Sequence, residues 1–158
     1  MRLTLQQATA QDATTLVAFE HKVADPKIYG PKLDVAGALE EIKKNTFYFI
    51  KRGDAIIGTA AFRLRTDKSV YISNVAVDPT YRRQGVAQAV MSNILEKCKE
   101  APRVDLVTHP ENKKALHLYT SLGFKVESRK ENYFGDGEPR LVLALACPQP
   151  EGRHDACP

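Results

Sequence analysis

The segment Tyr81–Ala87, YRRQGVA, combines residue types that suit contact with an anion. Arg82 and Arg83 can donate charge-assisted hydrogen bonds to phosphate oxygens. Gly85 has no side chain that would block an approach to the backbone. An apolar helical pattern begins directly after it, which places unpaired backbone N–H groups and the positive end of a helix dipole at this point. The segment therefore predicts a binding site for a phosphate-containing ligand.

This segment is short, and its pattern leaves other interpretations open. The same residue types occur in basic turns that cap a core helix and bind nothing. The sequence matches neither the GxxxxGK[ST] loop that holds nucleotide phosphates nor the three-glycine dinucleotide fingerprint. The surrounding elements, and a second motif, have to identify the ligand.

Hydrophobic periodicity places this segment between a strand-rich half of the chain and a half in which strands and helices alternate. Alternating patterns predict strands at residues 2–8, 71–79, 103–108, 124–133 and 139–146, and two more within 46–65 around the turn Arg52–Asp54. Apolar stripes at helical spacing predict helices at residues 11–23, 33–44, 84–99 and 112–122, the last closed by Gly123. The segment YRRQGVA thus joins a strand to a helix.

The composition is that of one globular domain. The chain has 158 residues, of which 43% are hydrophobic and 27% are charged, and a formal net charge of +4. A chain of this size fits a single core, so we expect one domain over residues 1–146. The residues after Ala146 are rich in proline and polar types, which predicts a disordered tail over residues 147–158.

Several function classes find no support in the sequence. Lysine and arginine are scattered among acidic residues without interleaved aromatic residues, so we expect no nucleic-acid partner. No apolar run reaches the roughly 18 residues of a membrane span. The segment Met1–Glu20 lacks the continuous apolar stretch of a signal peptide, so we expect a cytoplasmic protein with no membrane partner. Cys98, Cys147 and Cys157 lack the spacing of zinc ligands, which predicts free thiols and no metal.

A second motif, NKKALHLYTSLGF, covers Asn112–Phe124. Together with NVAVDPTYRRQGVAQAVM, residues 74–91, it resembles the two signature motifs of the GNAT superfamily of N-acetyltransferases. The two motifs occur in the family's order and are separated by a predicted helix and strand. The resemblance runs over residues 2–145 and identifies the chain as a member of this superfamily.

The resemblance implies an α/β fold, the GNAT fold, with a central mixed, mostly antiparallel, twisted sheet of about seven strands flanked by about four helices. In this fold a central pair of strands splays apart and forms the cleft for acetyl-CoA. These strands would be the one that ends at Val77 and the one at residues 103–108.

The resemblance also implies which residues bind acetyl-CoA. The backbone of Val75–Val77 would pair with the pantetheine arm as an added strand does, and the amides of residues 83–88 would bind the pyrophosphate. The family's [RQ]xxGx[GA] pattern is met at Arg82, Gly85 and Ala87, although many members have glycine where this chain has Ala87. The predicted cofactor-binding residues are Val75, Ala76, Val77, Arg82, Arg83, Gln84, Gly85, Val86, Ala87, Gln88, Asn112 and Tyr119.

Transfer of an acetyl group from a thioester to an amine needs a neutral amine, a polarised carbonyl and a proton for the leaving thiolate. Tyr119 matches the family's general acid. Its spacing alone favours an aromatic residue packed on the helix face with Ala115 and Leu122. We interpret Tyr119 as the catalytic acid because it lies within the matched motif.

The general base is not evident. The carboxylates that act as bases in the family are absent, because Val107 and Tyr71 occupy their positions. A water chain leading to solvent is the substitute that we expect. The nearby polar residues are interpreted as surface or structural groups; they are Tyr71, Ser73, His109 and Glu111.

The missing carboxylates favour an acceptor that is already neutral. An α-amine, with a pKa of about 7.7 to 8.0, is substantially neutral near pH 7.4, whereas a lysine with a pKa of about 10.4 costs about 4 kcal/mol to deprotonate there. A buried lysine acceptor stays open as an alternative, because burial lowers its pKa.

The C-terminal segment, residues 121–145, resembles the end of N-terminal acetyltransferases of the ribosomal-protein alanine type. Tyr133 matches the tyrosine that helps these proteins to hold the peptide N-terminus, and its alternative role is to steady a hairpin. Tyr29 lies where the family's acceptor loop falls, although the loop sequence does not match that branch well. Tyr29 and Tyr133 are therefore the predicted acceptor-binding residues.

These observations together predict an acetyl-CoA-dependent N-acetyltransferase that transfers the acetyl group directly, in a ternary complex, to a protein or peptide α-amine. The first alternative is a small amine acceptor such as an amino acid, a polyamine or an aminoglycoside. The second is a non-catalytic acyl-CoA sensor, which the missing carboxylates favour and the retained Tyr119 opposes. The enzyme would act as a monomer or a homodimer.

Overall fold

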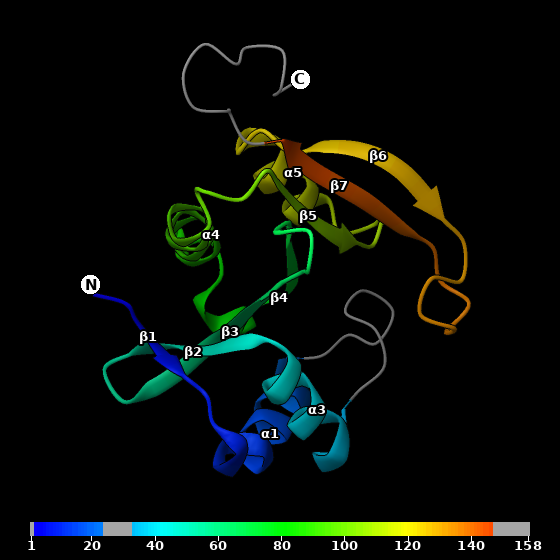
Figure 1. Cartoon of the computed structure of the whole chain (residues 1–158). Helices are drawn as coiled ribbons and strands as arrows, with labels where there is room; N and C mark the ends of the chain where they lie inside the picture. Colours follow the sequence, from blue (N-terminus) through cyan, green and yellow to red (C-terminus); the bar gives the residue numbers. More distant parts are fainter. Residues whose placement is uncertain (1, 24–32, 147–158) are drawn as a thin grey trace. The chain divides into compact units, whose positions relative to one another are not determined.

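A computed structural model describes residues 2–23 and 33–146 of the chain (Figure 1). Tyr29, Cys147, Cys157 and the predicted tail lie outside these residues. The described residues form two compact units: an N-terminal unit of residues 2–23, 33–63 and 73–94, and a C-terminal unit of residues 64–72 and 95–146. The single domain over residues 1–146 stays a prediction.

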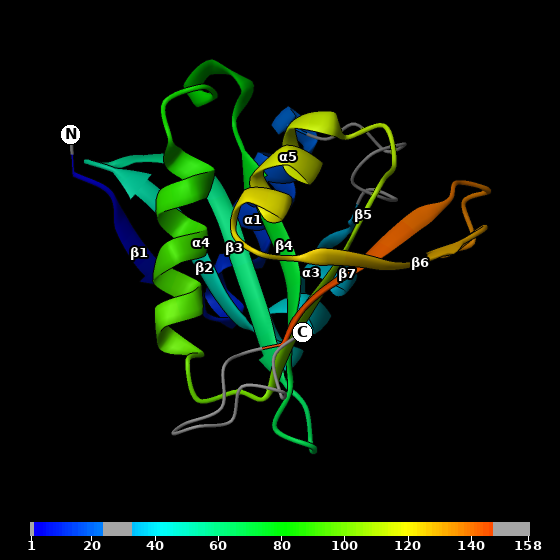
Figure 2. The ribbon, with the colours of Figure 1, turned by 90° about the horizontal axis from the view of Figure 1, so that it is seen from above.

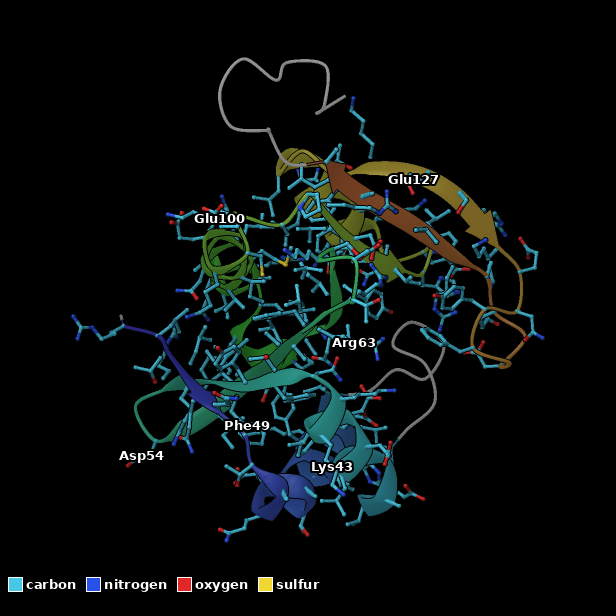
Figure 3. All side chains as sticks on the ribbon, viewed as in Figure 1. Lys43, Phe49, Asp54, Arg63, Glu100 and Glu127 are labelled. Atoms are coloured by element: carbon cyan, nitrogen blue, oxygen red, sulfur yellow. The ribbon has the colours of Figure 1, made fainter. Side chains whose placement is uncertain are left out.

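The N-terminal unit is built on the strands β1 (Thr4–Gln7), β2 (Thr46–Arg52) and β3 (Ala55–Leu64), which pair antiparallel in that order. Its helices α1 (Ala13–Val23) and α3 (Val35–Lys44) pack on apolar side chains of β2. The core of the unit consists of Ala8, Ala13, Leu16, Ala38, Ile42, Phe47, Phe49 and Ala61. Phe49 is labelled in Figure 3, together with Asp54 in the turn that joins β2 to β3.

The strand β4 (Val70–Val77) lies next to β3 in the sheet. A Cβ atom added to Gly58 of β3 would lie 2.6 Å from the carbonyl oxygen of Ala76, so glycine permits this close approach of the two backbones. Figure 2 lets the reader follow the chain from β4 through the turn that carries YRRQGVA into the helix α4 (Val86–Lys97).

The C-terminal unit contains β5 (Arg103–Thr108), the helix α5 (Lys113–Ser121), β6 (Lys125–Lys130) and β7 (Arg140–Ala146). The first residues of β4, Val70–Ile72, pair with β5 in parallel. β7 pairs antiparallel with β5 and with β6. Buried apolar side chains of the unit include Val104, Leu106, Phe124 and Leu143.

The hydrogen-bonded order β1-β2-β3-β4-β5-β7-β6 is that of a seven-stranded mixed sheet, with antiparallel pairing in most of its pairs. The described residues also contain the α-helices α1, α3, α4 and α5. The predicted α/β class and element order are therefore confirmed. The cleft at a splayed central pair stays a prediction. Within the described residues, no helix is both long and apolar enough to cross a bilayer.

Several predicted boundaries differ from the structure, and for two of them backbone angles give the reason. The helix α4 begins at Val86 and not at Gln84, because Arg83 and Gly85 have φ angles of 64° and 78°, which no right-handed helix contains. The strand β6 ends at Lys130 and not at Tyr133, because Asn132 has a φ of 53° and its carbonyl accepts from the Gly135 N–H in a turn.

Candidate functional site

The exit from β4 is held by a buried carboxylate. The Asp78 side chain is 3% exposed, its Oδ1 accepts from the Thr80 amide at 2.9 Å, and its Oδ2 lies 2.9 Å from the Lys22 Nζ of α1. The Asp78 N–H donates to the Ile57 carbonyl at 2.8 Å. The hydrogen bond and charge of Lys22 hold the pKa of Asp78 below its usual value. The chain therefore leaves β4 in one fixed direction.

The turn that follows exposes its backbone. Arg82, Arg83, Gln84 and Gly85 are exposed, whereas Val86, the first residue of α4, is 2% exposed and anchors the helix. Left-handed residues next to a helix N-terminus are the backbone geometry of anion-binding concavities. Residues 82–88 thus form this turn and the first residues of α4, and a short 3-10 helix at Pro79–Tyr81 separates them from Val75–Val77. Their contact with a cofactor stays a prediction.

The two arginines of the turn differ in what they contact. The Nε of Arg82 donates to the Val77 carbonyl at 3.1 Å, so its guanidinium is held at the end of β4. Arg83 is exposed and has a left-handed backbone, an uncommon conformation for a residue with a side chain. Arg83 is thus the more accessible of the two for contact with a phosphate.

Arg52, at the end of β2, also contacts the turn, and sequence reasoning missed it. Its Nη1 donates to the Gln84 Oε1 at 2.8 Å, and its guanidinium carbon lies 5.5 Å from the centre of the Tyr81 ring. Its Nε is buried and has no acceptor among the described residues. Arg52 and Gln84 are 32 residues apart, and the local pattern around Arg52 indicated a hairpin turn only.

The C-terminal unit contains the residues of the second motif. The Asn112 Oδ1 accepts from the Ala115 amide at 3.3 Å and caps α5. Tyr119 is 8% exposed, and its ring centre lies 6.0 Å from that of Phe124. The packing partner that the structure shows for Tyr119 is thus Phe124, at the end of the motif. The cofactor contacts predicted for both residues stay predictions.

Tyr133 lies in the connection between β6 and β7 and is 39% exposed. Its ring centre lies 4.9 Å from that of Phe134, edge to face, and the Arg140 guanidinium carbon lies 5.0 Å from the Phe134 ring centre. The connection therefore presents two aromatic side chains to solvent.

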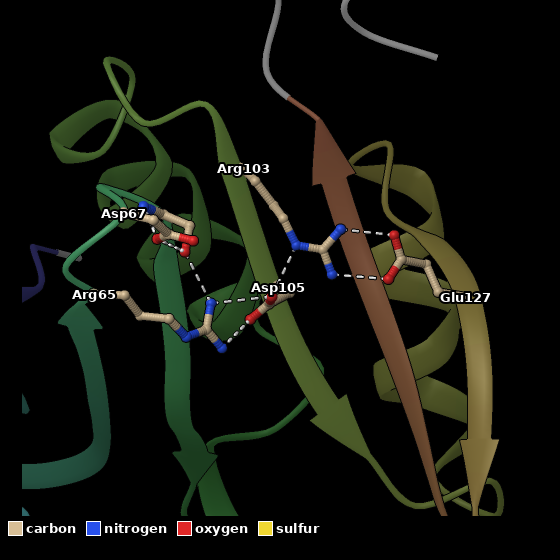
Figure 4. A network of polar contacts seen from close by, with 6 residues as sticks. Arg65, Asp67, Arg103, Asp105 and Glu127 are labelled. Carbon is tan, nitrogen blue, oxygen red and sulfur yellow. Dashed lines mark hydrogen bonds and ion pairs between the residues drawn. The ribbon is translucent and has the colours of Figure 1, made fainter.

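Carboxylates on β5 and β6 are bound by arginines (Figure 4). Asp105 accepts from Arg65 at 2.9 Å and 3.1 Å and from Arg103 at 3.0 Å. Arg103 also binds Glu127 through two hydrogen bonds of 2.7 Å and 2.8 Å, which hold the pKa of Glu127 below its usual value. These carboxylates serve as partners of arginines and not as candidates for a general base.

The remaining polar candidates have structural partners as well. The ring of Tyr71 lies 5.2 Å from the Arg65 guanidinium carbon, and the Ser73 hydroxyl donates to Asn45 at 3.0 Å. His109 is 1% exposed, so it is a buried residue with structural contacts and not a surface one. Among the described residues, no group of three or more histidines, cysteines and acids could hold a metal ion.

Comparison with known proteins connects this geometry to a family. A sequence model of the acetyltransferase (GNAT) family matches residues 13–124, more than half of the chain. The [ribosomal protein bS18]-alanine N-acetyltransferase of Escherichia coli K12 is 34% identical over 77 residues, which are 46% of this chain and 52% of that protein. The human N-alpha-acetyltransferase 30 is 33% identical over 102 residues, 59% of this chain and 27% of that protein. The match to the first of these spans about half the length of the relative.

Solved structures share the fold over nearly the whole chain. The ribosomal-protein-S18-alanine N-acetyltransferase from Escherichia coli has a TM-score of 0.79 at 18% identity, covering 96% of this chain and 97% of that chain. Ard1 from Thermoplasma volcanium has a TM-score of 0.81 at 19% identity, covering 94% and 100%. An acetyltransferase from Salmonella typhimurium, solved with acetyl-CoA, has a TM-score of 0.74 at 16% identity, covering 96% and 98%.

Proposed function

The chain belongs to the acetyltransferase (GNAT) family, and we propose that it transfers an acetyl group from acetyl-CoA directly to an amine, an N-terminal α-amine of a protein or peptide. The observation that carries this proposal is the turn between β4 and α4. It joins left-handed backbone at Arg83 and Gly85 to a helix N-terminus whose first residue is buried. Such a backbone suits the pyrophosphate of a coenzyme A ester.

Each predicted residue has a role in this proposal. The amides of residues 83–88 bind the pyrophosphate, Arg83 adds positive charge, and Arg52 keeps the turn in place through Gln84. The backbone of Val75–Val77 binds the pantetheine arm. Acetyl-CoA supplies the thioester carbonyl that the amine attacks. Asn112 and Tyr119 are assigned to the same ligand on the family resemblance.

Tyr119 is the proposed general acid. The neutral amine forms a bond to the acetyl carbon, the bond from that carbon to sulfur breaks, and the Tyr119 hydroxyl gives its proton to the leaving thiolate. The amine's own proton leaves to solvent through water. Tyr119 as a whole is 8% exposed, and the role of its hydroxyl is proposed on the family resemblance.

The proposed acceptor is an α-amine because the described residues provide no evident carboxylate base. Val107 and Tyr71 stand where the family's bases lie, and Asp105 is bound by two arginines. Relatives that act on α-amines support the same choice by their names. Tyr133, exposed in the β6–β7 connection, is the proposed contact for the acceptor peptide, together with Tyr29.

The test is thiol release from acetyl-CoA in the presence of matched peptides. One peptide begins with a free alanine, and its control has the same sequence with a blocked N-terminus and one lysine. We expect thiol release with the free α-amine and little with the control. Turnover of the control at the same rate would contradict the α-amine proposal, and turnover restricted to small amines would support the first alternative. Cofactor binding with no turnover of any amine would identify a sensor.

A further inference from the structure

His109 directly follows β5 and uses both of its ring nitrogens. It is 1% exposed. Its Nε2 lies 2.8 Å from the Glu138 Oε1, and its Nδ1 accepts from the Glu111 backbone N–H at 3.0 Å. Buried polar groups are normally hydrogen-bonded because each contact offsets the loss of hydration, and both ring nitrogens of His109 have such a partner.

These contacts identify the tautomer. A backbone N–H can only donate, so the Nδ1 that accepts from it carries no proton. The proton of the neutral ring therefore lies on Nε2, where it is donated to the Glu138 carboxylate. His109 thus forms a hydrogen-bonded bridge between two segments. Its acceptor end is Nδ1, which contacts Glu111, and its donor end is Nε2, which contacts Glu138.

The acceptor end of the bridge holds the start of α5. Besides the Nδ1 contact with Glu111, the His109 carbonyl accepts from the Asn112 N–H at 2.9 Å. Asn112 caps the helix through its own side chain. The helix that carries Tyr119 is therefore tied to the end of β5 at its first residues.

The donor end holds the connection between β6 and β7. The Glu138 carbonyl accepts from the Tyr133 N–H at 3.3 Å, and the Glu138 N–H donates to the Asp136 Oδ1 at 3.0 Å. Within the connection, the Asn132 Oδ1 accepts from the Gly137 N–H at 2.6 Å. Hydrogen bonds within the connection therefore join its residues to one another. Glu138 contacts Tyr133 through its backbone carbonyl and His109 through its side chain.

We infer that His109 is a positioning residue. It holds the β6–β7 connection, which carries Tyr133, at a fixed position relative to the start of α5, so that an acceptor peptide bound by Tyr133 is aligned with the helix that carries Tyr119. This inference rests on the proposed function. His109 is not a catalytic residue, because it is buried and both ring nitrogens are occupied. Its effect on acceptor binding passes through Glu138 to Tyr133, and its effect on kcat passes through the start of α5.

Two substitutions of His109 separate the two ends of the bridge. In His109→Asn the side-chain oxygen can replace Nδ1 and accept from Glu111, but it is too short to reach Glu138. In His109→Gln the amide can replace Nε2 and donate to Glu138, but it does not accept from Glu111. Glu138→Ala removes the contact between His109 Nε2 and Glu138, as His109→Asn does, but by changing the acceptor and not the histidine. Glu131→Ala is the matched control, because Glu131 lies in the same connection and is paired with Arg129.

The experiment measures KM for the alanine peptide, kcat, and Kd for acetyl-CoA in each variant. We expect His109→Asn and Glu138→Ala to raise the acceptor KM about tenfold, which is the loss of one hydrogen bond to a charged group. Their Kd for acetyl-CoA should stay near the wild-type value. His109→Gln should keep the acceptor KM and lower kcat, and Glu131→Ala should match the wild type. The double variant His109→Asn, Glu138→Ala should be no worse than either single one.

Other outcomes would overturn the inference. A wild-type acceptor KM in Glu138→Ala, which removes a partly exposed side chain, would show that the bridge does not position the acceptor. If all His109 variants raise KM and Kd and lower kcat and the melting temperature to the same extent, the role of His109 is purely structural. If the wild-type chain turns over no amine, the proposed function and the inference fail together. If the wild-type chain does turn over an amine and the acceptor KM is unchanged in His109→Asn and Glu138→Ala, the inference alone fails.

Discussion

Tyr119 illustrates how a single hydroxyl can be tested without disturbing the residues around it. Its ring is buried and is tilted by 58° against the ring of Phe124, which is 1% exposed. Phenylalanine has the same ring and would keep this packing. A change in activity on removal of the hydroxyl would therefore report on chemistry and not on folding.

We expect Tyr119→Phe to lower kcat by about 10²- to 10⁴-fold, the usual contribution of a general acid. The Kd for acetyl-CoA and the melting temperature should change little. Tyr48→Phe, which removes a hydroxyl from β2, is the control and should keep wild-type kcat. Steady-state kinetics and calorimetric binding measure these quantities. An undiminished kcat in Tyr119→Phe would remove this residue from the role of acid.

At the scale of elements, the turn between β4 and α4 depends on a left-handed glycine. Gly85 has a φ of 78°, and an added Cβ would meet no atom within 4 Å. Gly137 in the β6–β7 connection has a φ of 83° and equally open surroundings. Alanine at either position would carry backbone strain of roughly 1–2 kcal/mol without a steric clash. The two glycines are thus a matched pair in different units of the molecule.

We expect Gly85→Ala and Gly137→Ala to lower the free energy of unfolding by similar amounts. Gly85→Ala alone should also raise the Kd for acetyl-CoA, by about tenfold, because relief of the strain moves the amides of the turn. Urea unfolding and calorimetric titration with acetyl-CoA provide the two measurements. Equal Kd values in the two variants would argue against the turn as the pyrophosphate site.

At the scale of the whole molecule, stability depends on pH through paired carboxylates in both units. Lys22 holds the pKa of Asp78 below its usual value in the N-terminal unit, and Arg103 does the same for Glu127 in the C-terminal unit. A carboxylate with a lowered pKa in the folded state stabilises that state above the pKa of the unfolded chain, about 3.9 for aspartate. This contribution is lost as the pH falls through the folded-state pKa.

We expect Lys22→Met to lower the urea midpoint of unfolding at pH 7. The urea midpoints at pH 7 and at about pH 3 should also differ less than in the wild type, because the substitution removes the main cause of the lowered Asp78 pKa. Lys99→Met is the control. Lys99 and Glu96 form an exposed pair on adjacent turns, and such pairs contribute little. An unchanged pH dependence in Lys22→Met would show that the Asp78 pair does not contribute to acid sensitivity.

Local patterns were sufficient to predict most helices and strands. The strand at residues 103–108 was predicted to the residue, and Asn112 and Gly123 do flank α5. The start of α4 was predicted two residues too early. Arginine favours helices, so the residue type at position 83 gave no sign of its left-handed backbone conformation.

The family and the order of strands and helices followed from the sequence alone, because each depends on residues close together in the chain; the pyrophosphate site at the β4–α4 turn stays a prediction of the same local pattern. Only the tertiary structure decided that Arg52 supports this turn, 32 residues from Gln84, and that His109 joins Glu138, 29 residues away. Contacts of this kind depend on the register of strands and the course of connections. Local periodicity does not tell which distant polar groups the strand register and the connections will bring within hydrogen-bonding distance.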